Sequence, residues 1–262
     1  MPPKKNKADK TVTDLEILDS VVEAPATEIV CVIDRSGSME SIKTDAIGGF
    51  NNFLKEQQNE PGEATMTIML FDDKFEFLCQ GKSVKEVEPL SDKTFVPRGS
   101  TALLDAIGET ITSLNERNPE KAIIMILTDG HENASRNYNK GKIKQMIDAC
   151  KENKWFVAYL SADAEAFDDA QSVGIGHAQT MSFTPNQQGA HVSMMSCSYA
   201  ASDYRSAGYK GMSSMAVYGA TARNNYRPGI NETNHNPLFS SLGSSSDTKP
   251  KRKKAGSGGY FR

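Results

Sequence analysis

The sequence predicts an α/β domain built on a doubly wound, mostly parallel sheet, with helices on both faces and one antiparallel edge strand. Apolar runs rich in β-branched residues alternate along the chain with segments whose apolar residues recur every three or four positions. Most of these runs are continuously apolar, which is typical of strands covered on both faces. Such an alternation of strands and helices favours right-handed crossovers within a single sheet.

Four apolar runs are expected to form parallel strands, at residues 29–33, 66–71, 122–127 and 155–160. The run at 75–79 follows the second strand after the short stretch Asp72-Asp73-Lys74, so we expect the two to form a hairpin. This run would supply the antiparallel edge strand. A further short strand is expected at 179–183.

Apolar residues at helical spacing predict helices over about 42–54, 103–114 and 143–150. Another helix is expected at 165–173. A last helix is expected at 187–205, beginning after Pro185.

Length and charge indicate one folded domain between two basic ends. A chain of 262 residues suits a single core with tails. We expect a basic lead-in at 1–24, the folded domain at 25–206, and a tail at 207–262 that is too rich in Gly, Ser and Asn to order itself. Residues 1–10 and 247–262 contain ten Lys or Arg and two Asp or Glu, which leaves a net charge of about −11 between them.

We expect an intracellular, cytoplasmic protein without membrane association. The N-terminus lacks the apolar core of a secretion signal, and no apolar window is long enough to cross a bilayer. The four cysteines, Cys31, Cys79, Cys150 and Cys197, include no Cys-x-x-Cys pair, and three lie in apolar patterns. Reduced, buried thiols are therefore favoured over disulfides.

Oxygen-bearing side chains follow the ends of the predicted strands, where open α/β sheets bind ligands. The first strand ends at Asp34, and two serines follow at alternate positions, so that the three side chains can face one point. A threonine lies in a glycine-containing loop before a helix, and a second aspartate follows the strand at 122–127. Because Mg²⁺ prefers oxygen ligands, this pattern predicts a magnesium site, with Mn²⁺ as the alternative ion. The candidate ligands are Asp34, Ser36, Ser38, Thr101 and Asp129.

Three motifs in this order resemble those of the von Willebrand factor type A domain with its metal-ion-dependent adhesion site. They are Asp-x-Ser-x-Ser, a Gly-Ser-Thr before a helix, and a strand that ends in Thr-Asp-Gly. The resemblance covers about residues 28–205 and implies a Rossmann-like fold. It is strongest for the stand-alone intracellular members from bacteria and phages. It also implies that the hydroxyls of Ser36, Ser38 and Thr101 bind the ion directly, while the two aspartates act through water.

Neutral hydroxyl ligands leave a divalent ion under-neutralised, so the ion can also bind an outside carboxylate. We therefore expect a non-enzymatic protein-interaction module whose metal captures an Asp or Glu of a partner protein. Four residues beside the candidate site are expected to line its partner-binding rim: Arg35, Arg98, His131 and Glu132.

Two functions of other classes remain open from the sequence. The basic ends could bind nucleic acid, with the folded domain as a scaffold; the C-terminal cluster consists of Lys249, Lys251, Arg252, Lys253 and Lys254. Alternatively, Asp34 could be the nucleophile of a metal-dependent phosphatase or hydrolase. The sequence does not indicate the oligomeric state.

Overall fold

The computed structural model describes residues 26–162 and 165–226. Its six-stranded sheet has the order β3-β2-β1-β4-β5-β6. All neighbouring pairs are parallel except β2 and β3, which form an antiparallel hairpin at one edge. This confirms the predicted sheet. The strands are β1 (Thr27–Asp34), β2 (Ala64–Phe71), β3 (Phe75–Ser83), β4 (Lys121–Thr128), β5 (Phe156–Ser161) and β6 (Thr180–Ser182).

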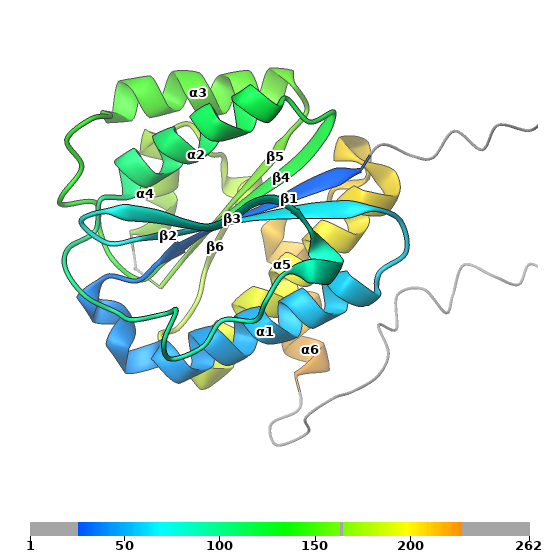
Figure 1. Ribbon diagram of the computed structural model, residues 1–262, viewed down its shortest axis with the longest axis horizontal. Helices are drawn as coiled ribbons and strands as arrows, with labels where there is room; N and C mark the ends of the chain where they lie inside the picture. The colour runs from blue at the N-terminus through cyan, green and yellow to red at the C-terminus, as the bar shows by residue number, and fades with distance from the viewer. Residues whose placement is uncertain (1–25, 163–164, 227–262) are drawn as a thin grey trace, which may run out of the picture. The chain divides into compact units, whose positions relative to one another are not determined.

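Helices cover both faces of the sheet (Figure 1). One face carries α2 (Leu103–Arg117), α3 (Lys140–Glu152) and α4 (Ala166–Ser172); the other carries α1 (Lys43–Asn59), α5 (Gln187–Ala207) and α6 (Met215–Asn225). Short 3₁₀ helices lie at Gly37–Ile42, Val84–Glu86, His177–Gln179 and Tyr209–Gly211. Within residues 26–162 and 165–226, none of the helices combines the length and apolar character that a bilayer crossing needs.

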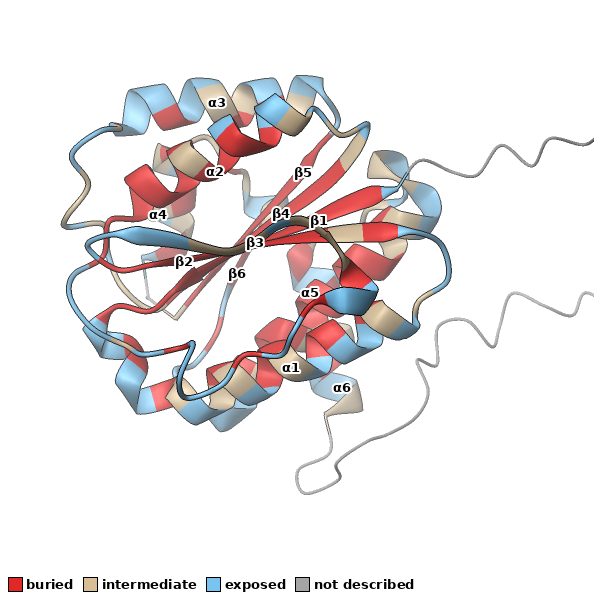
Figure 2. Ribbon diagram, in the orientation of Figure 1, coloured by how far each residue is buried: buried red, intermediate tan, exposed pale blue. Residues whose placement is uncertain are grey.

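The central strand β1 is apolar throughout because its two faces meet two different cores. Ile29, Cys31 and Ile33 face the core shared with α1 and α5, whereas Val30 and Val32 face the core shared with α2 and α3. Figure 2 shows the resulting pattern, in which the inner strands are buried, the edge strand β3 is partly exposed, and the outer sides of the helices are exposed.

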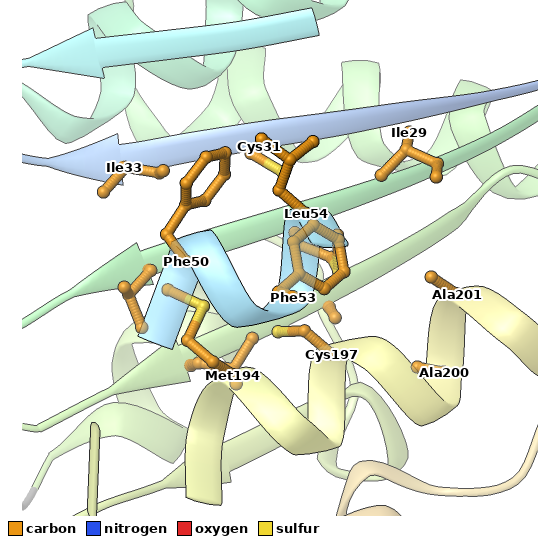
Figure 3. Packing of buried hydrophobic residues seen from close by; sticks show 14 of the residues in the cluster. Ile29, Cys31, Ile33, Phe50, Phe53, Leu54, Met194, Cys197, Ala200 and Ala201 are labelled. Carbon is orange, nitrogen blue, oxygen red and sulfur yellow. The ribbon is translucent and has the colours of Figure 1, made fainter. Parts of the chain in front are cut away.

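Helices α1 and α5 pack closely beneath β1 (Figure 3). Phe50, Phe53 and Leu54 of α1 fill the space between the strand and α5. Gly49 allows the close approach, since a Cβ there would lie 2.9 Å from the Cγ of Met194 on α5.

All four cysteines are free thiols, as the sequence predicted. Cys31, Cys150 and Cys197 are buried, whereas Cys79 is half-buried. Burial raises the pKa of Cys150 and of Cys197 to about 12, so these thiols stay protonated at neutral pH.

The structure differs from the sequence-based expectation after residue 206, where composition predicted little order. Helix α6 spans Met215–Asn225, and Ser214 caps its N-terminus with a side chain that accepts a hydrogen bond from the backbone N–H of Val217. Its residues Met215, Tyr218 and Ala222 are buried in the core shared with α5. The expectation of disorder is therefore wrong for α6, while residues 1–25 and 227–262 lie outside the described residues.

The packing of α6 predicts that Met215→Ala lowers the free energy of unfolding by about 2–5 kcal/mol, because it leaves a cavity in a fully buried site. Val217→Ala is the matched control on the same helix, since Val217 is 53% exposed and should change stability by less than about 0.5 kcal/mol. Urea denaturation of the full chain measures both. Equal unfolding midpoints for the two variants would contradict the packing of α6.

Candidate metal centre

The carboxylate of Asp34 is fully buried at the end of β1, and both of its oxygens are held. Oδ1 accepts a hydrogen bond from the backbone N–H of Ser36 at 2.6 Å, and Oδ2 accepts one from the Thr128 hydroxyl at 2.6 Å. Thr128 is the last residue of β4, which pairs directly with β1. The next residue, Asp129, therefore lies at a neighbouring strand end.

The three predicted hydroxyl ligands lie around the same point. The hydroxyl oxygens of Ser36 and Ser38 are 3.0 Å apart, and Ser38 donates to Oδ1 of Asp129 at 2.7 Å. A Cβ added to Gly130 would lie 3.4 Å from Oγ1 of Thr101 and 3.7 Å from Oγ of Ser38, so a glycine leaves this space open. The structure thus brings the five predicted side chains together, and their role as metal ligands remains a prediction.

The electrostatics of the cluster suit a bound cation. Among the described residues, neither Asp34 nor Asp129 forms an ion pair with a basic side chain. Burial raises the pKa of Asp34 to about 6, although hydrogen bonds from Thr128 and Ser36 lower it, and burial also raises the pKa of Asp129. A divalent ion would supply the missing positive charge.

The donor set consists of three hydroxyls and two carboxylates, which fits a hard cation such as Mg²⁺. In the part of the chain that the structure describes, no group of three or more His, Cys, Asp or Glu residues is arranged to hold a metal. The hydroxyls are therefore essential to this candidate.

Asp72, which sequence reasoning missed, connects the loop after β1, which carries Ser36 and Ser38, with the loop before α2, which carries Thr101. It is fully buried after β2, and its Oδ2 accepts hydrogen bonds from Nε of Arg35 and Nε of Arg98, both at 2.9 Å. Backbone bonds join the same loops, from Arg98 to the carbonyl of Arg35 and from Gly37 to the carbonyl of Gly99. Burial alone would raise the pKa of Asp72, but hydrogen bonds from the Lys74 backbone and Arg98, together with the Arg35 charge, hold it below its ordinary value.

The loop after β4 also holds the Thr101 backbone in place, through Asn133. Oδ1 of Asn133 accepts from the backbone N–H of Thr101 at 2.9 Å, and the backbone N–H of Asn133 donates to the Thr101 carbonyl at 3.0 Å. The Glu132 carboxylate accepts from the backbone N–H groups of Leu104, Ala134 and Ser135, which joins this loop to the start of α2. The sequence offers no local signal for these contacts.

Two of the four residues expected at the rim have a different role. Arg35 is 4% exposed and pairs with Asp72 and Glu76. The Glu132 carboxylate already accepts the backbone hydrogen bonds described above. Arg98 and His131 are exposed, as a rim requires, and Nδ1 of His131 lies 3.0 Å from Oδ2 of Asp169. The C-terminal basic cluster at 249–254 lies outside the described residues.

Part of this chain matches a known protein family, and its fold is similar to that of several solved structures. Residues 29–132 match the model of the von Willebrand factor type A domain. The pilus adhesin SpaC from Lactobacillus rhamnosus GG, in its open conformation, aligns with 70% of this chain and 30% of its own, at 13% identity and a TM-score of 0.55. Proximal thread matrix protein 1 from the mussel byssus, solved with a zinc-occupied MIDAS motif, aligns with 68% of this chain and 46% of its own, at 15% identity and a TM-score of 0.51.

The chain spans less than half the length of either structure, and likeness at this level of identity shows the shared fold. The comparison with curated proteins gives no significant match.

The burial of the Arg35–Asp72 pair predicts that Asp72→Ala costs about 3–5 kcal/mol of stability, because it leaves buried Arg35 without its main partner. Glu76→Ala is the control, since it removes the half-exposed partner of the same arginine and should cost less than about 1 kcal/mol. Chemical denaturation distinguishes the two. Similar losses in both variants would show that Asp72 is not the residue that holds these loops.

Proposed function

Because this chain carries a von Willebrand factor type A domain, we propose that it is a metal-dependent protein-interaction module. In this proposal a divalent cation, bound by Asp34, Ser36, Ser38, Thr101 and Asp129, captures an Asp or Glu side chain of a partner protein. The observation that carries the proposal is the cluster of hydroxyls and unpaired carboxylates at neighbouring strand ends.

The accessibility of the cluster supports capture of an outside group. Asp34, Ser36 and Thr101 are buried, whereas Gly37 and Ser38 are exposed, so the centre meets solvent on the side of Gly37 and Ser38. An ion bound mainly by neutral hydroxyls keeps enough positive charge to attract a carboxylate from that open side.

We propose Mg²⁺ as the resident ion, with Mn²⁺ as the alternative, because all the candidate ligands are oxygens. The mussel byssus protein, solved with a zinc-occupied MIDAS motif, supports a divalent cation on this fold. The ion would supply the attraction for the partner's carboxylate, and this chain's residues would hold and orient it.

A binding role is favoured over a catalytic one. Asp34 would be the nucleophile of a phosphatase, but it is fully buried and both its oxygens accept short hydrogen bonds. The nucleic-acid alternative depends on basic residues outside the described residues, so the described surface adds no support to it.

Loss of one hydroxyl tests the metal site directly. Thr101→Val keeps the shape of a side chain that is 3% exposed and should weaken Mg²⁺ binding by at least about tenfold in isothermal titration calorimetry. Thr65→Val is the matched control, because Thr65 lies near the start of β2, at the end of the sheet away from the candidate centre, and outside the residues proposed to bind the ion or the partner. Unchanged affinity in Thr101→Val, or no uptake of Mg²⁺ by the wild type, would contradict the proposed centre.

Affinity capture tests the interaction. Tagged full-length protein, incubated with a lysate of the cells that encode it, should retain partner proteins in Mg²⁺ and release them in EDTA. Thr101→Val should lose the same proteins, and Thr65→Val should keep them, as judged by mass spectrometry. Retention of the same proteins with EDTA present would exclude a metal-bridged interaction.

A further inference from the structure

A cleft of about 950 Å³ adjoins the candidate metal centre, and we name it the hairpin cleft. It lies between the turn that joins β2 to β3 and the loop that follows β4. Ser100 and Ala102, which flank Thr101 in the sequence, are part of its lining, so the cleft and the candidate centre share a loop. Lys74 and Phe75 line one wall, and Arg136 and Asn137 line the other.

The walls of the hairpin cleft are already ordered. The Asp105 carboxylate of α2 accepts hydrogen bonds from the backbone N–H groups of Arg136, Asn137 and Tyr138, each at 2.9 Å. On the opposite wall, the backbone N–H of Lys74 donates to Oδ1 of Asp72 at 2.9 Å. A ligand would therefore enter a preformed cleft without having to order its walls.

Two of the three exposed charged residues that line the hairpin cleft are basic. Lys74 and Arg136 are exposed, and neither forms an ion pair within residues 26–162 and 165–226. Asp105 is 7% exposed and its charge is already satisfied by backbone donors, which leaves Asp73 as the exposed acidic residue of the lining. Two unpaired cations on an otherwise acidic protein favour an acidic ligand.

An exposed aromatic ring lies on the same wall as Lys74. Phe75 is 40% exposed, which is high for a large apolar side chain, and its ring can cover the apolar part of a bound chain. The hairpin cleft therefore offers one apolar contact beside two cationic ones.

We infer that the hairpin cleft selects the partner by binding a second acidic side chain of the same extended segment whose first carboxylate binds the metal. This inference rests on the proposed function and names the partner class as a segment with two acidic residues a few positions apart. Successive side chains of an extended segment are spaced about 3.3 Å per residue, so one segment can reach both the metal and the adjoining cleft. Complementary charge at this position determines which segment binds.

Reversal of the cleft's charge tests the inference without a known partner. A library of random displayed peptides is selected in Mg²⁺ and eluted with EDTA, first on the full-length wild type and then on the Lys74→Glu/Arg136→Glu variant. We expect two acidic residues in the wild-type peptides, and one acidic and one basic residue in those from the variant. A wild-type peptide should bind the variant at least about tenfold more weakly, while Mg²⁺ affinity stays within about twofold.

The control is Lys55→Glu/Lys85→Glu, which reverses two exposed lysines outside the lining of the cleft and should select the wild-type motif. The same motif from the wild type and the cleft variant would overturn this inference and leave metal capture intact. Failure of the wild type to yield any peptide that EDTA elutes would overturn the proposed function, and this inference with it.

Discussion

The candidate centre depends on the burial of the Asp34 carboxylate at the end of β1. A buried carboxylate without a counter-charge is costly, and within residues 26–162 and 165–226 no basic side chain pairs with Asp34 to relieve that cost. Arg35 and Arg98, the basic residues of the adjoining loops, are directed to Asp72 instead. Asp72 thereby joins the loops, while Asp34 and Asp129 keep an uncompensated negative charge that a divalent ion can balance.

The order of the strands brings these parts together. β1 lies between β2 and β4, so the segments that follow these three strands meet at one edge of the sheet. The segment after β1 carries Ser36 and Ser38, and the segment after β2 carries Asp72, which binds Arg35. The segment after β4 carries Asp129 and Asn133, whose side chain accepts a hydrogen bond from the backbone N–H of Thr101. Two hydrophobic cores, one on each face of the sheet, support the strands that carry these segments.

Periodicity and residue type predicted the sheet, its antiparallel edge and the five clustered side chains, because each of these leaves a local pattern. Asp72, Thr128 and Asn133 could not be found in this way, since their partners lie between 26 and 94 residues away. Arg35 was wrongly expected at the rim, although the alternation that directs Asp34 and Ser36 to one side directs the residue between them to the other. Helix α6 was missed because a composition averaged over a long tail hides a short helix with only a few buried residues.

The central claim is that these five side chains hold one divalent ion. Anomalous diffraction from a crystal grown with Mn²⁺ measures this most directly, because it locates the metal independently of any partner. We expect one anomalous peak among the oxygens of Ser36, Ser38 and Thr101, on the open side of Asp34 and Asp129. A map without a peak there, or with the ion bound elsewhere, would contradict the claim.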